Sequence, residues 1–326
     1  MKKILLIGGA GYVGTELVFF LENKFKIIVY DLFIYGDQFP NTDSIIKVKG
    51  DIRNKKLLQK TIKNNDIDTI IHLACISNDP SFDLDPDLGK SINFDPFEDL
   101  VKISKDAGVK KFIYASSSSV YGVKKEIDVN ENCSLEPITD YSKFKVLCEE
   151  ILIKYSNIDF CCSIIRPATV CGFSRRQRLD LVVNILTNNA FHKGEITIFG
   201  GDQLRPNIHI KDMCAVYDLL LVSNPDKING KIFNAGYENF EVKKLATIVS
   251  ENIGKKIVLK FEKTNDNRSY HISSDKIKNE LGFINKYSIE NAVTDLRDAF
   301  INKSFLDPLN NEMYFNIKRM QSINLK

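Results

Sequence analysis

Short apolar runs rich in branched residues alternate with amphipathic segments along the first half of the chain. The run Ile4-Leu5-Leu6-Ile7 is too short for a helix and is typical of a strand buried on both faces. Residues 13–21 follow with apolar side chains at helical spacing. The alternation continues, with strands expected at residues 27–30, 45–48, 69–73, 111–115 and 160–165, and helices at about 54–64, 88–107 and 140–155. Strands joined by helices pair in parallel, so we expect a doubly wound sheet with ligands at the carboxyl ends of its strands.

The second half of the chain is less regular. Helix 211–222 and strand 231–234 are expected to return to the sheet. A smaller lobe is expected from a strand at 196–199 and helices near 179–191, 241–253, 274–280 and 288–302. We therefore predict a sheet domain at 1–166 with a return segment near 205–235, a lobe made of 167–204 and 236–305, and a tail with little pattern at 306–326.

A glycine-rich turn joins the first strand to the first helix. Gly9, Gly11 and Gly14 satisfy the pattern G-x-G-x-x-G, and Gly8 extends the turn. Glycines let backbone N–H groups approach a pyrophosphate, which the positive end of the helix dipole also attracts. Asp31 ends the second strand twenty residues after Gly11, where it can accept hydrogen bonds from ribose hydroxyls and would repel a 2′-phosphate. We therefore expect a dinucleotide site that prefers NAD to NADP.

Tyr141 and Lys145 are one helical turn apart on the predicted helix 140–155. A phenol has an unperturbed pKa of about 10, and a nearby ammonium and a positive nicotinamide ring would lower that pKa. The phenolate could then take a proton from an alcohol while hydride leaves the carbon. The serine run 116–119 follows a buried strand, so one of its hydroxyls could hold the substrate oxygen beside Tyr141. Together these residues favour hydride transfer over a chance surface pair.

Composition excludes several other classes. The chain has 326 residues, 44% of them hydrophobic, and a net charge of +3 with interspersed signs, so neither nucleic-acid nor membrane binding is expected. No apolar run approaches the ~18 residues of a membrane span, and glycines interrupt the first run before it could be a signal peptide. The seven cysteines are scattered without C-x-x-C pairs, which indicates reduced thiols of a cytoplasmic protein. The four histidines have no ligand spacing, so no metal site is expected.

The motifs jointly resemble the extended short-chain dehydrogenase/reductases, and more narrowly their nucleotide-sugar epimerase/dehydratase branch, to about Ala299. They are the glycine-rich turn, Asp31, Asp51-Ile52, His72-Leu73-Ala74, the serine run with Val120-Tyr121-Gly122, and Tyr141-x-x-x-Lys145. This resemblance implies a Rossmann-like doubly wound parallel sheet with a smaller C-terminal α/β substrate lobe. It also implies NAD as cofactor and a nucleotide-diphosphate sugar as substrate.

The resemblance further implies roles for individual residues. Ser117 would be the catalytic hydroxyl, Tyr141 the acid/base and Lys145 the ligand of the nicotinamide ribose. The implied cofactor residues are Gly8, Gly11, Tyr12, Val13, Asp31, Asp51, Ile52, Leu73, Ala74, Asn93, Ser116, Tyr141, Lys145 and Pro167. The implied substrate residues are Ser77, Ser118, Thr169, Arg178, Arg205 and Arg268, of which Arg205 and Arg268 would clamp the diphosphate.

Two features are left open. The basic run 175–178 is interpreted as a substrate loop, with a solvated turn or a nucleic-acid patch as alternatives. Cys171 stands where family members commonly have Tyr, and no role is assigned to it.

The residues after the implied catalytic hydroxyl reduce the number of reactions that the family resemblance allows. Dehydratases of this branch have Asp-Glu where Ser118-Ser119 stand, which disfavours 4,6-dehydration. The 3,5-epimerase/reductases use a Cys that this loop lacks. We therefore expect a 4-epimerase acting by transient C4 oxidation, with a C4 dehydrogenase or 4-ketoreductase as alternatives. A catalytically silent NAD-binding regulatory protein is an alternative of another class, and the intact Ser117, Tyr141 and Lys145 argue against it.

A homodimer is also expected. The helices near 88–107 and 140–155 carry more apolar residues than one sheet face needs, and the family packs this helix pair into a four-helix bundle between subunits. The residues concerned are Phe97, Leu100, Val101, Phe144, Leu147 and Ile151.

Overall fold

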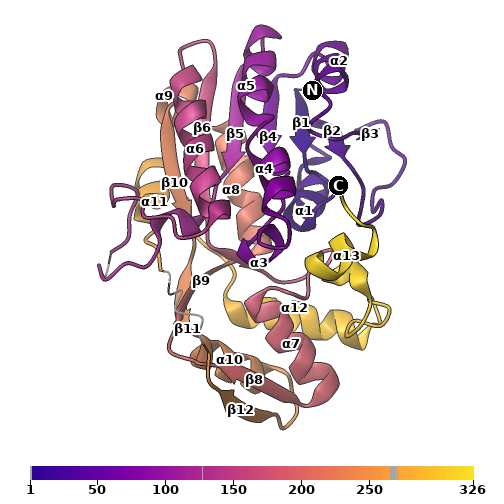
Figure 1. The fold of residues 1–326 in the computed structure, drawn as a ribbon, viewed down its shortest axis with the longest axis vertical. Coiled ribbons are helices and arrows are strands. Elements are labelled where there is room, and N and C mark those ends of the chain that lie inside the picture. The colour runs from indigo at the N-terminus through magenta and orange to yellow at the C-terminus, as the bar shows by residue number, and fades with distance from the viewer. Residues whose placement is uncertain (1, 127, 265–268, 270) are drawn as a thin grey trace.

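The computed structural model describes residues 2–126, 128–264, 269 and 271–326, and its centre is a seven-stranded sheet (Figure 1). The strand order is β10-β6-β5-β4-β1-β2-β3, and each neighbouring pair is parallel. The strands are β1 (Lys3–Ile7), β2 (Lys26–Asp31), β3 (Ile45–Lys49), β4 (Thr69–His72), β5 (Lys111–Ala115), β6 (Cys161–Pro167) and β10 (Lys231–Ala235). The predicted doubly wound parallel sheet is therefore confirmed.

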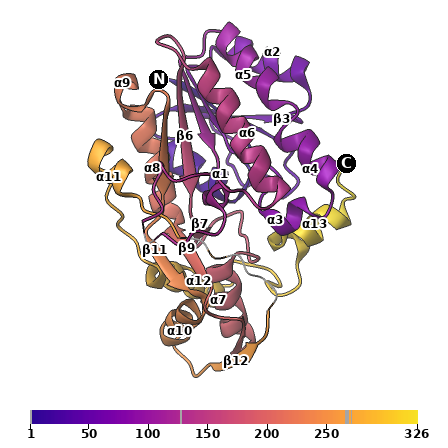
Figure 2. The same ribbon diagram turned by 60° about the vertical axis from the view of Figure 1, so that its left-hand side comes forward.

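Helices cover both faces of this sheet (Figures 1 and 2). Successive side chains of β1 point to opposite faces, so Ile4 and Leu6 belong to one hydrophobic core and Leu5 and Ile7 to another. The first core includes residues of α1 (Tyr12–Leu21) and α8 (Ile210–Val222). The second includes residues of α2 (Lys55–Asn65), α4 (Pro86–Asn93), α5 (Phe97–Asp106) and α6 (Asp140–Tyr155). Both faces of a parallel sheet must be covered, which explains its almost continuously apolar strands.

The single helix expected at 88–107 is wrong, because two helices, α4 and α5, occupy this segment. Pro96 lies between them as the N-cap of α5. Proline lacks an N–H group and keeps the preceding residue out of helical geometry, so it ends one helix and begins the next. Asp85 caps the first helix by accepting the N–H of Leu88 at 3.0 Å, and the preceding loop contains the short α3 (Asp79–Phe82).

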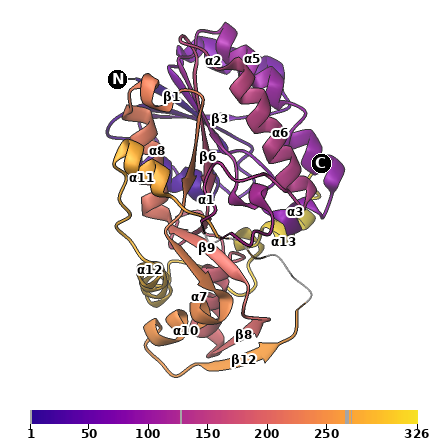
Figure 3. The same cartoon turned by 90° about the vertical axis from the view of Figure 1, so that its left-hand side faces the viewer.

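A smaller lobe lies at one end of the large sheet (Figures 1 and 3). Its core is formed by apolar residues of three helices and a two-stranded parallel sheet. These are α7 (Val182–Lys193), α10 (Val242–Asn252), α12 (Ile289–Ile301), β8 (Glu195–Phe199) and β12 (Val258–Glu262). A three-stranded sheet of β11 (Glu238–Glu241), β9 (Leu204–His209) and β7 (Thr169–Cys171) connects this lobe to the large sheet.

The remaining short elements lie in the connections and in the tail. They are the turns η1 (Ser118–Tyr121) and η2 (Glu312–Tyr314) and the helices α9 (Pro225–Ile228), α11 (Asp275–Leu281) and α13 (Asn316–Ser322). The tail folds back against the large sheet, where Arg319 donates to the carbonyl of Ile34 at 2.7 Å and Met320 is buried. A helix this short is held by such tertiary contacts rather than by its own propensity, which is why the sequence carried little pattern here.

Candidate active site

A cavity of about 380 Å³ lies where the carboxyl ends of β1, β2, β4 and β5 face the lobe. The sheet side contributes the glycine-rich turn, Asp31, the serine run and Tyr141. The lobe side contributes Leu181 before α7 and Pro206 on β9. The position agrees with the rule that open parallel sheets bind ligands at the carboxyl ends of their strands.

The glycine-rich turn needs its glycines because the backbone passes very close to its neighbours. Gly8 has a φ of +82°, and a side-chain carbon there would lie 2.4 Å from the backbone N of Ala74. A side-chain carbon on Gly14 would lie 2.6 Å from the carbonyl oxygen of Gly8. Residues 11–13 line the cavity at the first turn of α1, where backbone N–H groups have no intrahelical acceptor. The N–H of Gly11 donates to the carbonyl of Gly8 at 3.3 Å, so the turn can present the N–H groups of Tyr12 and Val13 to an anion.

Asp31 is held next to this turn by backbone hydrogen bonds. Its carboxylate accepts the N–H of Ala10 at 3.0 Å and that of Phe33 at 2.8 Å. Burial raises the pKa of Asp31, whereas these N–H groups and the nearby Arg176 guanidinium act to lower it. A carboxylate fixed at the end of β2 and facing the cavity is what the predicted ribose contact requires.

Ser117, Tyr141 and Lys145 line the same cavity from two elements. Lys145 follows Tyr141 by one turn of α6, and its Nζ lies 5.7 Å from the centre of the tyrosine ring. Nζ donates to the carbonyl of Ala115 at 2.7 Å, which leaves further N–H bonds for a ligand because an ammonium has three. The Ser117 hydroxyl shares a 2.9 Å hydrogen bond with that of Ser119. The structure thus brings together the three residues that the sequence predicted as catalytic.

The pKa of Tyr141 moves opposite to the expectation. Burial raises this pKa well above the usual value, and the nearby Cys75 and Asp79 raise it further. A hydrogen bond from Ser117 and the charge of Arg178 act in the lowering direction without reversing the shift. In the protein without NAD, desolvation of the buried phenolate outweighs the groups that lower this pKa, and the lowering expected from Lys145 together with the nicotinamide ring stays a prediction.

The start of α6 is fixed by a capping box that places Tyr141 in the first helical turn. Thr139 accepts the backbone N–H of Ser142 at 3.3 Å, and the Ser142 hydroxyl accepts the backbone N–H of Thr139 at 3.1 Å. The Thr139 hydroxyl also donates to Asp79 at 2.5 Å. The loop after β4 and the helix that carries Tyr141 are therefore joined beside the cavity.

A buried ion pair behind the serine run was not predicted as part of the site. Arg166 on β6 donates to Glu149 on α6 through Nε at 3.0 Å and Nη2 at 2.6 Å, and both residues are buried. The Ser116 hydroxyl donates to the same carboxylate. Arg166 also donates to the Tyr121 hydroxyl at 2.8 Å, which donates to Asn234 at 2.7 Å. The network fixes both ends of the serine loop. In the sequence it was indicated only by two charged residues that stand among apolar ones.

All predicted cofactor, catalytic and substrate residues line the cavity except Asn93, Arg205 and Arg268. Asn93 uses both side-chain polar groups on the backbone of Ile76, at 2.8 and 3.0 Å, so it supports the loop after β4 from behind. Arg205 donates to the carbonyl of Leu204 at 3.0 Å and lies next to the cavity wall. Arg268 lies outside the described residues.

Several lining residues were given no individual role by sequence reasoning, and four of them bear on the cofactor site. Tyr35 follows the second strand of the sheet, Arg176 belongs to the basic run, and Asn316 and Leu325 come from the tail. Of these four residues, only Arg176 stood out in the sequence, because it belongs to the basic run. The sequence alone did not show on which side of the cavity this arginine lies. Tail residues reach the site through contacts with distant parts of the chain, which no local pattern encodes.

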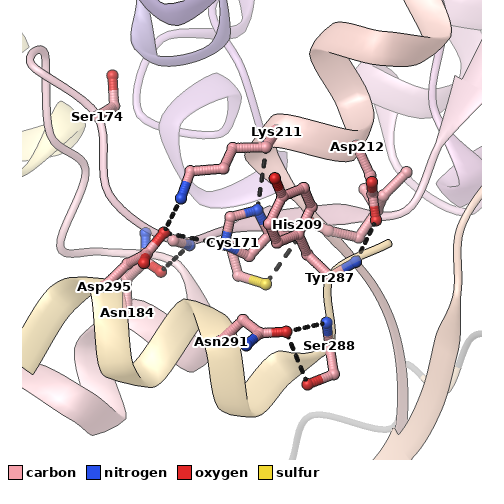
Figure 4. Close-up of polar contacts among 12 residues, drawn as sticks. Cys171, Ser174, Asn184, His209, Lys211, Asp212, Tyr287, Ser288, Asn291 and Asp295 are labelled. Carbon is pink, nitrogen blue, oxygen red and sulfur yellow. Dashed lines mark hydrogen bonds and ion pairs between the residues drawn. The ribbon is translucent and has the colours of Figure 1, made fainter. Parts of the chain in front are cut away.

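Cys171 lies outside the cavity, next to the buried His209 on β9 (Figure 4). Its thiol contacts the carbonyl of Ile208 at 3.5 Å, and burial raises its pKa, so it is a core thiol rather than a nucleophile. The His209 ring stacks on Tyr287 with centroids 4.9 Å apart, and its Nε2 lies 3.4 Å from Asp295 on α12. These contacts link β9 to α12 and have a packing role.

Two classes of feature are absent from the part of the chain that the structure describes. It contains no group of three or more His, Cys, Asp or Glu residues that could hold a metal ion. Nor does any of its helices have the length and apolar character to cross a membrane.

The profile of the NAD dependent epimerase/dehydratase family matches residues 4–236, which is more than half of the chain. The chain belongs to this family. It is therefore an NAD-dependent enzyme of the short-chain dehydrogenase/reductase type, which confirms the predicted family and cofactor.

Curated relatives of the epimerase/dehydratase chain carry two different activities. A UDP-glucose 4-epimerase of Lactobacillus helveticus is 27% identical over 263 residues, covering 74% of this chain and 79% of the relative. A dTDP-D-glucose 4,6-dehydratase of Dictyostelium discoideum is 28% identical over 287 residues, covering 79% of this chain and 62% of the relative. These relatives therefore do not decide which of the two reactions this chain catalyses.

Solved structures of this family have the same fold. A UDP-glucose 4-epimerase from Thermotoga maritima with UDP-glucose superimposes with a TM-score of 0.83 at 24% identity, covering 92% of this chain and 99% of its own. A dTDP-glucose 4,6-dehydratase from Bacillus anthracis in complex with NAD gives 0.83 at 22% identity, covering 95% and 100%. At these identities the likeness supports the fold alone.

The residues of the cavity fit NAD. The glycine-rich turn forms a cradle that side-chain carbons would fill, and Asp31 lines the cavity at the end of β2, where the sequence predicts a ribose contact. Arg176 and Arg178 also line the cavity, and each has buried guanidinium nitrogens without a hydrogen-bond partner among the described residues. Buried cationic donors of this kind match an anionic ligand such as a pyrophosphate.

Proposed function

We propose that this enzyme is a nucleotide-sugar 4-epimerase that oxidises C4 transiently and returns the hydride to the other face. The observation that carries the proposal is the meeting of Ser117, Tyr141 and Lys145 in one cavity, with serines rather than carboxylates at 118 and 119. The 4-epimerases among the relatives support it. Dehydration would need an acid and a base at positions where this chain has only hydroxyls.

The chain's own residues divide the proton chemistry among them. Ser117 holds the substrate oxygen, Tyr141 removes its proton and later returns one, and the free N–H bonds of Lys145 hold the nicotinamide ribose. When bound, NAD supplies the hydride acceptor and a positive charge that favours the phenolate. Burial raises the pKa of Tyr141, so the charge of bound NAD would have to favour the phenolate that accepts the substrate proton. The phenol formed in that step then holds the proton that is returned to the sugar oxygen.

The substrate's diphosphate would meet the arginines on the lobe side of the cavity. Arg178 is buried, pairs with Asp180 at 2.9 Å and donates to Ser77 at 2.9 Å, while its Nη2 has no partner among the described residues. Arg205 lies next to Pro206 on the cavity wall. Guanidinium groups suit this task because they offer several charge-assisted hydrogen bonds to phosphate oxygens.

The proposal is tested by incubating the NAD-loaded enzyme with a panel of nucleotide sugars and their 4-keto derivatives. We expect C4-inverted product without net change in NADH absorbance, determined from product stereochemistry. Stoichiometric NADH formation would instead identify a C4 dehydrogenase, and NADH consumption with a 4-keto sugar a ketoreductase. If nothing in the panel were turned over, the silent NAD-binding protein would be favoured.

A homodimer through α6 is proposed on a narrower set of residues than the sequence indicated. Phe97, Leu100 and Val101 are 0–1% exposed and belong to the chain's own core, so they cannot form an interface. Leu147 on α6 is 39% exposed, and the neighbouring Phe144 is only half-buried. These outer-face residues are what a second copy could cover.

We expect light scattering at micromolar concentration to give the mass of a dimer, and Leu147→Glu to shift it toward the monomer. A charge placed in an apolar interface lacks a partner and opposes association. Ile158→Glu is the matched control, because Ile158 is 92% exposed beyond the end of α6. A monomeric wild-type protein would contradict the proposal.

A further inference from the structure

Arg176 is a buried cation whose hydrogen-bonding capacity is only partly used. The residue is 3% exposed, and its Nη2 donates to the side-chain oxygen of Asn316 at 2.8 Å. Its guanidinium carbon stacks 3.5 Å from the centre of the Tyr35 ring. Nε and Nη1 have no partner in the described part of the chain. Leaving charged donors unsatisfied in a buried place is costly, which indicates a ligand.

The loop that carries Arg176 is attached to the glycine-rich turn. The hydroxyl of Tyr12 donates to the carbonyl of Gly172 at 2.7 Å, and the Ser174 hydroxyl donates to the carbonyl of Tyr12 at 2.9 Å. Tyr12 is the first residue of α1, directly after that turn. The turn and Arg176 therefore border the same part of the cavity and can contact the same anion.

The three arginines of the basic run have different surroundings. Arg175 points away, pairing with Glu16 at 2.8 Å on the surface. Arg176 stacks on Tyr35, four residues after Asp31, and acts on the ionisation of Asp31. Arg178 instead donates to Ser77 after β4 and acts on the ionisation of Tyr141. The adenosine side of the cavity is thus next to Arg176, and the reacting side is next to Arg178.

We propose that Arg176 binds the pyrophosphate of NAD on its adenosine side, so that the cofactor is held by the glycine-rich turn and by a guanidinium from the lobe segment. The interpretation of residues 175–178 as one substrate loop then applies to Arg178 alone. Arg176 is suited to this role because its guanidinium remains charged and offers charge-assisted hydrogen bonds to phosphate oxygens.

Asn316 acts in this proposal as a positioning residue. Its side-chain nitrogen donates to Ser77 at 3.2 Å, and its backbone N–H donates to Asp180 at 2.9 Å. Its side-chain oxygen is thereby fixed where it accepts from Arg176. The tail thus orients a cofactor contact without touching the cofactor in this scheme.

The test compares Arg176→Gln with Arg175→Gln, which removes a neighbouring arginine outside the cavity. Binding of NAD and ADP-ribose to the NAD-free protein is measured by calorimetry, and binding of UDP and dTDP to the NAD-loaded protein. We expect Arg176→Gln to weaken NAD and ADP-ribose about 10- to 100-fold, the usual range for a hydrogen bond to a charged group, and to leave UDP and dTDP unchanged. Arg175→Gln should change none of the four.

Two results would overturn the proposal. Loss of UDP or dTDP affinity with unchanged ADP-ribose affinity would assign Arg176 to the substrate diphosphate. A lower unfolding temperature with unchanged ADP-ribose affinity would assign it to packing. If Arg176→Gln does not fold, Arg176→Lys keeps the charge but loses the planar donors, and ADP-ribose affinity equal to wild type would then contradict the contact. None of these readouts depends on finding a sugar substrate.

The role of Asn316 is tested by a double-mutant cycle on ADP-ribose affinity. Asn316→Ala should weaken ADP-ribose by less than Arg176→Gln does. In the double variant it should add almost nothing, because the residue it positions is gone. Additive losses would show that Asn316 acts independently of Arg176.

Discussion

Tyr141→Phe is expected to lower turnover by about 10²- to 10⁴-fold while folding and NAD affinity stay nearly unchanged, because one acid/base group is removed. The ring keeps its edge contact with Phe82, whose centroid is 6.3 Å away, so packing is preserved. Only the phenolic oxygen, which would carry the proton, is lost. Single-turnover kinetics on the nucleotide sugar identified by the panel, together with NAD calorimetry, measure the two quantities.

Three companion variants make this prediction specific. Ser117→Ala should reduce turnover less than Tyr141→Phe, because only a hydrogen bond is removed. Lys145→Ala should weaken both NAD binding and turnover, since Lys145 lines the cavity and its Nζ is 5.7 Å from the centre of the Tyr141 ring. Tyr114→Phe is the matched control, because Tyr114 is buried near Lys145 but does not line the cavity. Near-normal turnover by Tyr141→Phe would refute the assigned mechanism.

Glu149→Ala is expected to lower the free energy of unfolding by about 3–5 kcal/mol, the usual effect of removing one partner of a buried ion pair. Arg166 would remain buried between the sheet and α6 without its counter-charge. Ser116 would lose its acceptor as well, so the serine loop would be less well fixed. Urea denaturation followed by circular dichroism measures the loss.

The neighbouring Glu150→Ala provides the control on the same helix. Glu150 is exposed, so its removal should change stability by no more than about 0.5 kcal/mol. The double variant Glu149→Leu/Arg166→Met should be more stable than Glu149→Ala, because no isolated charge is left inside. A single variant Glu149→Ala as stable as wild type would contradict the role given to this pair.

The sequence predicted the parts of the site that depend on local patterns. The glycine-rich turn and Asp31 follow from the spacing between a strand and a helix, and both lie on the cavity. Tyr141 and Lys145 share a helix face because they are four residues apart. The serine run lies at the same sheet edge because it follows a strand of a parallel sheet. Each inference needed only neighbouring residues.

Features that depend on distant contacts were missed or misjudged. The direction of the Tyr141 pKa depends on how deeply the fold buries it, which spacing does not reveal. Phe97 was assigned to an interface because its helix carries more apolar residues than one sheet face needs, whereas Phe97 packs into the chain's own core. Asn316 was left in a tail, although it contacts Arg176 from 140 positions away.

The cavity joins Gly8 to Asn316 and Leu325, so it exists only when segments from opposite parts of the chain have met. Contacts so far apart in sequence carry a large loop-closure entropy and slow folding. A ligand that binds only the completed cavity raises the free energy of unfolding, by about 2.7 kcal/mol when its concentration is a hundred times its Kd. We therefore expect the protein to survive proteases longer when NAD is abundant, because NAD binds only the folded form in which the cavity is complete.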